Sequence, residues 1–274
     1  MEGAYPLSTP TASPSPSSRR ERRLAARAAA TPGIERQRTS TERRRTSPLI
    51  WTTVAVGVVG VLVVAVLLVV QGATPRTVDV ASLRPPLSVA PAALADGRSL
   101  GEADAPVTIE IWSDFQCPAC GQLAEMVEPI LIREYVTDGT LRLVLRDAAF
   151  QGRRSGASYD ESVESAAGAR CAAEQNLYWP FHNWLFANQV GENEGAFRDE
   201  RLRAIATAAG LDVVAWDACR ASGEQQTAVR TETQQAVDQG VNATPTMVLN
   251  GQMIVGLKSA EEIGGLIEAA AQGS

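Results

Sequence analysis

The cysteine pair in Cys117-Pro118-Ala119-Cys120 constrains this chain more than any other feature of its sequence. The pair follows an apolar, strand-like run at residues 107–112. After it, apolar residues recur at helical spacing, namely Leu123, Met126, Val127, Ile130 and Leu131. This order predicts that Cys117 begins a helix and that Cys120 lies one turn inside it. The partial positive charge of a helix N-terminus favours a thiolate at Cys117, which can attack another disulfide, and Cys120 would resolve the mixed disulfide.

Two other uses of such a pair stay open. It could be half of a zinc site, which needs two more ligands from Cys171, Cys219 and the single histidine, His182. It could also be a structural disulfide, although a bridge that closes so short a loop stabilises a fold only weakly. The context between a strand and a helix favours a redox-active pair, and we expect neither a metal nor another cofactor.

Residues 49–70 form a segment of 22 residues without a charge. As a helix, such a segment is about 33 Å long and matches the apolar core of a bilayer. The alternative is a cleaved secretory signal, but the apolar core of a signal is about 7–15 residues long and follows a short basic region. Because 48 residues precede this segment, we expect an uncleaved, single-pass membrane anchor.

The arginines predict how this anchor is oriented. Five of them lie at residues 36–45, just before the segment, whereas only Arg76 and Arg84 follow it closely. The positive-inside rule then predicts a cytoplasmic N-terminus and an extracytoplasmic domain, in a compartment where disulfides persist. Residues 1–48 carry ten arginines and four glutamates, so the rest of the chain has a net charge of about −12 and is not expected to bind nucleic acid.

The other segments are predicted from composition and periodicity. Residues 1–48 are rich in Ser, Thr, Pro and Arg, which is typical of a disordered tail, and the Pro- and Ala-rich residues 71–95 predict a semi-extended spacer. Residues 96–274 are expected to form an α/β domain. Its predicted elements are strands at 107–112 and 141–145, a helical insertion at about 157–240, strands at 246–249 and 253–255 joined by Asn250-Gly251, and a last helix over 259–271 with Ser259 as N-cap.

This order of elements resembles the DsbA-like thiol:disulfide oxidoreductases of the thioredoxin superfamily. The resemblance covers about residues 96–272 and rests on linked segments, among them Ser113-Asp114-Phe115-Gln116-Cys117-Pro118-Ala119-Cys120, Arg170-Cys171-Ala172-Ala173-Glu174-Gln175 and Ala243-Thr244-Pro245-Thr246. It implies a thioredoxin-like fold with a helical insertion, Cys117 as nucleophile and Cys120 as resolving thiol, with Pro118 and Ala119 between them. It also implies that Pro245 is a cis-proline that presents the Thr244 backbone to a polypeptide. An ordinary trans proline is the alternative.

Two positions depart from the pattern of this family. Its members often carry a buried acid six residues before the nucleophile, where this chain has Ile111. Glu110 is one residue out of phase and is expected to face the other side of the strand. Strongly oxidising members have a histidine between the cysteines, where this chain has Pro118-Ala119, so we expect a less oxidising pair.

Cys171 and Cys219 both lie in the helical insertion. An even number of cysteines in an oxidising compartment suggests that these two form a structural disulfide, as in some actinobacterial relatives, and free buried thiols are the alternative. His182 lies in an aromatic helical segment, where a core or helix-surface role is favoured over catalysis.

These features predict a membrane-anchored, extracytoplasmic thiol:disulfide oxidoreductase that passes the Cys117–Cys120 disulfide to secreted or cell-envelope proteins. A membrane oxidase of the DsbB or vitamin K epoxide reductase type would reoxidise the pair. A reductase or disulfide isomerase of the same fold is the alternative within this class. A redox-inert, membrane-anchored binding or sensor module is the alternative from another class.

Overall fold

The computed structural model describes residues 48–72, 78–156 and 158–273. The chain divides into two compact units, Met1–Gln71 and Gly72–Ser274. The predicted disordered tail, up to residue 47, lies outside the described residues, and so do residues 73–77 of the predicted spacer.

The predicted membrane span at residues 49–70 falls within the helix α2 (Pro48–Gly72). Side chains in α2 are described at residues 52–53 and 55–66, and all of these are exposed. Counted over the described residues, no helix of the chain meets the length and hydropathy that a membrane span requires, so the structure does not show the predicted span.

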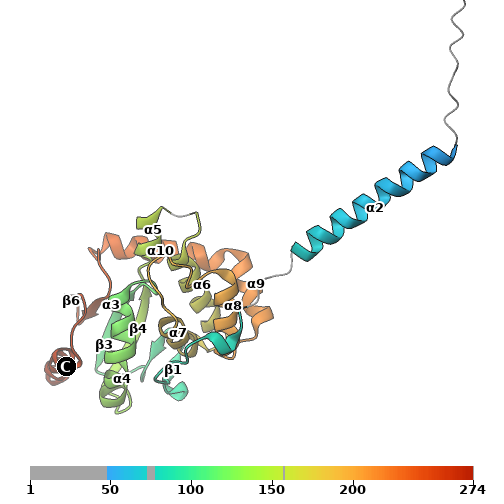
Figure 1. The fold of residues 1–274 in the computed structure, drawn as a ribbon. Coiled ribbons are helices and arrows are strands. Elements are labelled where there is room, and N and C mark those ends of the chain that lie inside the picture. The colour runs from blue at the N-terminus through green and yellow to red at the C-terminus, as the bar shows by residue number, and fades with distance from the viewer. Residues whose placement is uncertain (1–47, 73–77, 157, 274) are drawn as a thin grey trace, which may run out of the picture. The chain divides into compact units, whose positions relative to one another are not determined.

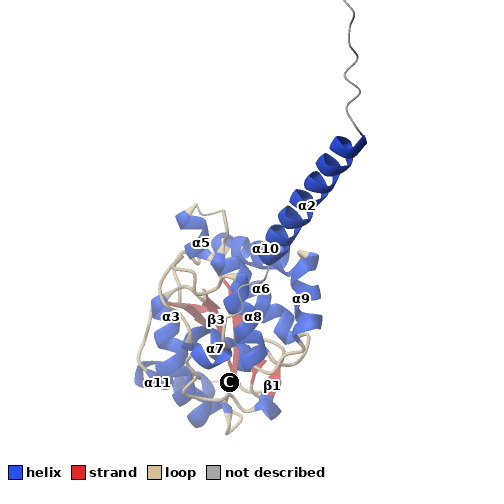
Figure 2. Ribbon diagram, turned by 45° about the vertical axis from the view of Figure 1, so that its right-hand side comes forward, coloured by secondary structure: helices blue, strands red, loops and turns tan. Residues whose placement is uncertain are grey.

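A mixed sheet of six strands forms the centre of the second unit (Figure 1, Figure 2). The strands lie in the order β1-β2-β4-β3-β5-β6, in which only β3 and β4 are parallel neighbours. Their bounds are β1 Ala95–Asp96, β2 Ser99–Leu100, β3 Val107–Ser113, β4 Leu141–Asp147, β5 Thr246–Leu249 and β6 Gln252–Val255. Parallel neighbours need a crossover connection, and the helix that begins at the cysteine pair supplies it. The β1–β2 hairpin was not predicted, because two-residue strands show no periodicity.

The predicted helical insertion consists of helices without an intervening strand in the described residues. Short helix α5 precedes it, and α11 closes the chain. The bounds are α5 Phe150–Ser155, α6 Glu161–Ala173, α7 Tyr178–Ala187, α8 Asp199–Ala208, α9 Val213–Ser222, α10 Glu224–Asp238 and α11 Ala260–Gln272. Ser259 is the N-cap of α11, as expected, and it forms a capping box with Glu262. Asn250 and Gly251 both have positive φ in the β5–β6 turn, as a tight hairpin requires.

Helices cover both faces of the sheet. On one face, Ile109 and Ile111 belong to the main core together with Ile263 of α11. On the other face, Trp112 packs in a separate cluster with Ala236 of α10. Figure 1 shows α6, α8 and α9 gathered on one side of the strands and the C-terminal end on the other. The hydroxyl of Tyr135, near the end of the helical run that begins at the cysteine pair, donates to Glu268 of α11 at 3.0 Å, so this run lies on the same side of the sheet as α11.

A cluster of ion pairs with buried carboxylates connects the insertion to the sheet. Arg98, beside the β1–β2 hairpin, lies 2.6 Å from Glu232 of α10, and Arg170 of α6 lies 2.5 Å from Asp147 at the end of β4. Arg170 also contacts Glu232 at 2.6 Å. Loss of one partner would leave a buried charge unpaired, which is energetically costly. These contacts therefore hold the insertion in place against β4.

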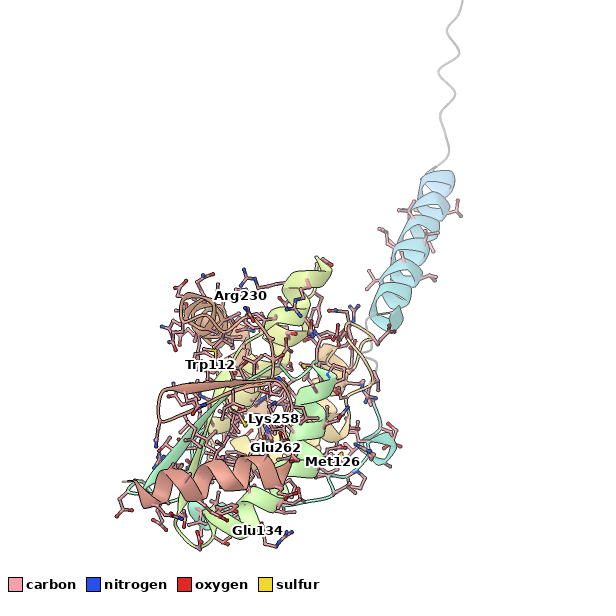
Figure 3. The ribbon with its side chains drawn as sticks, turned by 90° about the vertical axis from the view of Figure 1, so that its left-hand side faces the viewer. Trp112, Met126, Glu134, Arg230, Lys258 and Glu262 are labelled. Carbon is pink, nitrogen blue, oxygen red and sulfur yellow. A yellow bond between two sulfur atoms is a disulfide. The ribbon has the colours of Figure 1, made fainter. Side chains whose placement is uncertain are left out.

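The helix that begins at the cysteine pair is one run of four segments, α3 (Pro118–Gln122), η3 (Leu123–Val127), α4 (Glu128–Leu131) and η4 (Ile132–Val136), of which η3 and η4 are wider π-helical turns. Pro129 has no N–H to donate, which accounts for the irregular turn before it. The wider turn changes which residues face the core. Met126, predicted on the apolar face, is 67% exposed, whereas Glu128 is buried. Figure 3 shows Met126 and Glu134 on the outer side of this run.

Part of the predicted spacer is bound to the domain. Residues 78–94 contain two short turns, η1 (Val80–Ser82) and η2 (Ala92–Leu94), and bury Leu83 and Ala90. The backbone of Arg84 donates to Asn188 Oδ1 and accepts from Asn188 Nδ2, both at 2.9 Å. The spacer interpretation therefore does not hold for residues 78–94, because burial and hydrogen bonds tie them to the insertion.

Candidate active site

Cys117 is the N-cap of α3, and Pro118 occupies its first turn. Proline is favoured there because a helix leaves its first N–H groups without intrahelical partners. Cys117 is 5% exposed and Cys120 is 1% exposed, and both are free thiols. The helix therefore presents Cys117 at its N-terminus and keeps Cys120 inside, as the sequence predicts.

The two thiols differ in acidity. The side chain of Cys120 hydrogen-bonds to Cys117, and the Thr244 side chain and the backbone of Cys120 and Ala119 make further hydrogen bonds to it. Together these contacts lower the pKa of Cys117 to about 6, although burial opposes the shift. Burial raises the pKa of Cys120 well above its usual range, and its contacts with Cys117 act in the same direction. At neutral pH, Cys117 is therefore the thiolate and Cys120 the thiol.

The entrance to β5 lies beside the reactive cysteine. Trp112 of β3 pairs with Thr246 of β5, and this register brings residue 244 to the end of β3. Cys117 Sγ lies 3.3 Å from the carbonyl oxygen of Thr244. The Thr244–Pro245 peptide bond is cis, as the resemblance implies. All of the residues expected at the redox site thus come together.

The insertion holds the loop before the cysteines through Gln189. Its Nε2 donates to the carbonyl oxygens of Phe115 at 2.6 Å and Cys117 at 3.0 Å. Gln116 is fully buried and accepts from the N–H of Asn193 in the loop between α7 and α8. Sequence reasoning gave these residues no role, because their partners lie more than 70 positions away.

Asp114 is a further group that sequence reasoning missed. It is 2% exposed, three residues before Cys117, and its carboxylate accepts hydrogen bonds from the N–H groups of Gln116, Phe150 and Gln151. Its only sequence signal was its place in the segment on which the family resemblance rests.

The position where relatives often carry a buried acid is apolar here. Ile111 is fully buried in the core. Glu110 points to the other face, where it lies 2.6 Å from Arg146 and its side chain is 32% exposed. The expected departure from the family pattern is therefore present, and Glu110 does not substitute for the missing acid.

A buried carboxyl and the buried histidine meet behind the site. Glu128 Oε2 lies 3.8 Å from His182 Nε2, and His182 Nδ1 lies 2.9 Å from Asn183 Oδ1. Burial raises the pKa of Glu128 to about 8 and lowers that of His182 to about 4. At neutral pH neither group is charged, so this contact is a neutral pair and not an ion pair. His182 packs against Phe115 and Phe186, which gives it the predicted core role.

Cys171 of α6 and Cys219 of α9 are joined by a disulfide. These are the two cysteines expected to pair. Cys171 is 1% exposed and Cys219 is partly buried, and the bridge connects two helices of the insertion.

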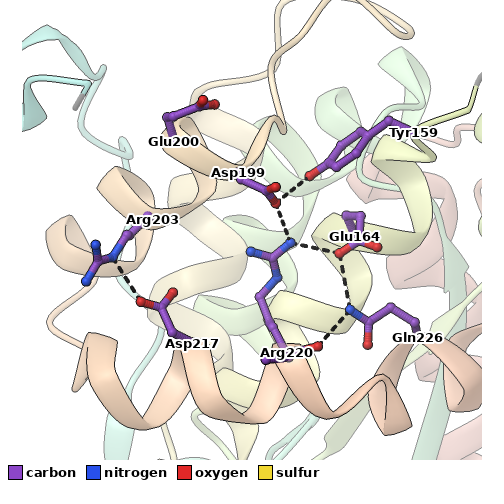
Figure 4. A pocket seen from close by; sticks show the side chains of 9 residues that line it. Tyr159, Glu164, Asp199, Glu200, Arg203, Asp217, Arg220 and Gln226 are labelled. Atoms are coloured by element: carbon purple, nitrogen blue, oxygen red, sulfur yellow. Dashed lines mark hydrogen bonds and ion pairs between the residues drawn. The ribbon is translucent and has the colours of Figure 1, made fainter. Parts of the chain in front are cut away.

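A pocket of about 490 Å³ lies between α6, α8 and α9, and neither redox cysteine lines it. Five of its charged side chains form ion pairs with one another (Figure 4). Arg220 contacts Glu164 at 2.7 Å and Asp199 at 2.8 Å, and Arg203 contacts Asp217 at 3.0 Å. Within residues 48–72, 78–156 and 158–273, no group of three or more His, Cys, Asp or Glu side chains could hold a metal ion.

Known proteins share this fold and this sequence pattern. A family model described as Thioredoxin matches residues 94–269. The chain is 29% identical over 159 residues to the "Probable disulfide bond formation protein D" of Bacillus anthracis, a match that covers 57% of this chain and 70% of that protein. Oxidised BdbD from Bacillus subtilis resembles it with a TM-score of 0.56 at 20% identity, over 69% of this chain and 98% of that one. Wolbachia pipientis alpha-DsbA1 resembles it with a TM-score of 0.55 at 18% identity, over 64% and 90% of the two chains.

The fold and the cysteine pair at its helix N-terminus define a DsbA-like thiol:disulfide oxidoreductase. Because the family model covers more than half of its residues, the chain belongs to the thioredoxin family.

Proposed function

We propose that this protein is a disulfide donor for secreted or cell-envelope proteins, with Cys117 as the reactive cysteine and Cys120 as its partner. The difference in acidity between the two thiols carries this proposal, since Cys117 is more acidic than a usual thiol and Cys120 less so. A thiol of low pKa is a good leaving group and keeps the reduced protein stable, which are properties of an oxidant.

The exchange runs in two steps. A substrate thiolate attacks Cys117 Sγ, the Cys117–Cys120 bond breaks, and Cys120 leaves and takes up a proton. A second substrate thiolate then attacks the substrate sulfur of the mixed disulfide, and Cys117 leaves as a thiolate. The substrate is oxidised by two electrons, and the protein becomes the dithiol. Its low pKa makes Cys117 the better leaving group in the second step.

The loop of Thr244 and Pro245 supports the first step. The Thr244 carbonyl lies 3.3 Å from Cys117 Sγ, so an extended polypeptide could add its backbone there while its sulfur reaches Cys117. Pro118 and Ala119, between the cysteines, carry no charge that would add to the stability of the thiolate.

We also propose that the domain is extracytoplasmic and attached to the cell membrane through residues 49–70. The absence of charge over the 25 residues of α2, the arginines before it, and the Cys171–Cys219 disulfide support this placement. A donor must be reoxidised after each cycle. A membrane oxidase of the DsbB or vitamin K epoxide reductase type would accept the two electrons.

The test uses two single variants of the full chain. Cys120→Ser should accumulate mixed disulfides with oxidised substrate proteins, because Cys117 can still attack a substrate disulfide but Cys120 is no longer present to displace the bound substrate. Cys117→Ser should form none. A variant that replaces Cys171 and Cys219 by serine serves as the control and should form no additional adducts. Equal adduct formation by the two single variants would contradict the proposed roles.

The direction of exchange is measured by equilibrium with glutathione. A reduction potential of about −120 to −180 mV would support a donor or isomerase, and one near about −270 mV would instead define a reductase. Absence of exchange would contradict the redox proposal and favour a binding or sensor module.

A further inference from the structure

The buried carboxylate of Asp114 lies in the connection between β3 and α3, immediately before the reactive cysteine. Its backbone carbonyl oxygen accepts a hydrogen bond from the N–H of Cys117 at 3.0 Å, which closes a tight turn. The residue is 2% exposed. A buried acid is thus built into the turn that delivers Cys117 to the helix N-terminus.

Four donors fix the orientation of this carboxylate. Its Oδ1 accepts from the N–H of Gln116 at 2.9 Å. Its Oδ2 accepts from the N–H of Phe150 at 2.8 Å and of Gln151 at 2.9 Å. Ser162 Oγ donates to it as well, at 2.8 Å from Oδ1 and 3.0 Å from Oδ2. All four are donors, so they favour the ionised form of the acid.

The surroundings of Ser162 support the same protonation state. Ser162 Oγ accepts hydrogen bonds from the N–H of Gly152 at 3.2 Å and from Gln116 Nε2 at 2.8 Å. Because both of these groups donate to Ser162 Oγ, the hydroxyl proton of Ser162 is free to be donated to Asp114. A hydroxyl that must donate needs an acceptor, and the carboxylate provides it.

Among the residues that the structure describes, no cation compensates the charge of Asp114. Within residues 78–156 and 158–273 the structure shows no ion pair between Asp114 and an Arg or Lys side chain. Arg154 of α5 donates to Gln151 Oε1 and to the carbonyl oxygen of Asn242 instead. The carboxylate of Glu161, in α6, accepts from the backbone N–H groups of Gly195 and Phe197, which lie in the loop between α7 and α8.

Asp114 and Cys117 disfavour each other's negative charge. Burial raises the pKa of Asp114 to about 6, its hydrogen bonds oppose the shift, and the charge of Cys117 acts in the same direction as burial. Repulsion between two charges is reciprocal, so the Asp114 carboxylate must also disfavour the Cys117 thiolate.

We propose that Asp114 is a positioning residue of the redox site, whose fixed buried charge disfavours the Cys117 thiolate and makes the Cys117–Cys120 disulfide a weaker oxidant than a neutral side chain would. This inference rests on the proposed function and deepens it. According to this inference, an acid three residues before Cys117 reduces the oxidising strength of the cysteine pair. The position at which the family often carries an acid is Ile111 in this chain.

The first test is Asp114→Asn in the full chain, equilibrated with glutathione. In this reaction the protein disulfide and two glutathione thiols give the protein dithiol and one glutathione disulfide. Loss of the charge should shift the equilibrium about tenfold toward the protein dithiol, and lower the pH midpoint of the Cys117 thiolate absorbance by about one unit. The matched control is Glu161→Gln, which also neutralises a buried acid that accepts two backbone N–H groups but should leave the equilibrium unchanged.

A second measurement uses the wild-type chain and does not depend on the folding of a variant. The carboxyl carbon of Asp114 is titrated by NMR in the reduced and the oxidised protein. We expect a lower Asp114 pKa in the oxidised protein, because the disulfide carries no charge. Identical titrations in the two states, or a glutathione equilibrium of Asp114→Asn within twofold of wild type, would overturn the proposal. Failure of the wild-type pair to exchange with glutathione would instead contradict the proposed function.

Discussion

The Sγ atom of Cys117 lies 3.3 Å from the carbonyl oxygen of Thr244, a residue 127 positions further along the chain. The contact exists because β5 pairs with β3, so that the residues just before β5 lie beside the N-terminus of α3. The reactive sulfur therefore lies between a helix N-terminus and the start of the β5–β6 hairpin.

Cys120→Ala should raise the pKa of Cys117 from about 6 toward its ordinary value of 9.0, because the side chain of Cys120 makes the largest contribution to the lowered value. The pH dependence of alkylation by iodoacetamide measures this change. Cys120→Ser, which keeps a hydroxyl donor, is the matched control and should retain more of the shift. Equal midpoints in wild type and Cys120→Ala would contradict this account of the acidity.

Glu128→Gln should stabilise the protein at pH 8 and have little effect at pH 5. The pKa of Glu128 is raised by burial from 4.5 to about 8 in the folded protein. As pH rises through this range, the unfolded chain releases the proton first and is favoured, so the free energy of unfolding falls. The gain at pH 8 is a few kcal/mol, since each pKa unit corresponds to about 1.4 kcal/mol.

Denaturant unfolding of the reduced protein at several pH values measures this difference. Glu134→Gln serves as a control, because Glu134 lies in the same helical run with its side chain 49% exposed. The titration of His182 overlaps the acidic part of this range, since its folded pKa is lowered from 6.5 to about 4 and stability is lost as pH falls through these values. His182 is present in both proteins, so the comparison of Glu128→Gln with wild type at each pH isolates the contribution of Glu128. A constant difference between Glu128→Gln and wild type from pH 5 to pH 8 would refute the buried-acid interpretation.

Gly101→Ala should destabilise the domain by at least about 2 kcal/mol. Gly101 has a φ of +118°, and a Cβ there would lie 2.4 Å from the carbonyl oxygen of Leu141. Gly97→Ala is the matched control, because Gly97 also has positive φ, at +54°, but nothing lies within 4 Å of the added Cβ. Its expected cost is about 1 kcal/mol. Thermal unfolding compares the two variants, and similar losses would show that the close approach of β4 is unimportant.

Replacing both Cys171 and Cys219 by serine should lower the free energy of unfolding by about 4 kcal/mol in the chain-entropy model, because the bridge joins residues 48 positions apart. The glutathione equilibrium of the Cys117–Cys120 pair should not change. A loss of stability is measured by denaturant unfolding. A changed redox equilibrium in this variant would mean that the second disulfide also acts in exchange.

Local sequence signals predicted most elements of the fold. The cysteine motif marked the start of α3, Asn250-Gly251 marked the β5–β6 turn, and Ser259 marked the N-cap of α11. These predictions succeeded because turns, caps and helix starts depend on residues that are close in sequence. The apolar face of the active-site helix was predicted less well, since the wider turn before Pro129 changes its periodicity.

The sequence by itself determined that the cysteine pair begins a helix, and it determined the order of the longer strands and helices along the chain, because each of these follows from neighbouring residues. Only the tertiary structure decided that Thr244 contacts Cys117, that residues 78–94 bind the insertion, and that Asp114 is buried among donors from α5 and α6. These contacts join residues far apart in the chain, and sequence periodicity carries no information on burial or charge across such distances.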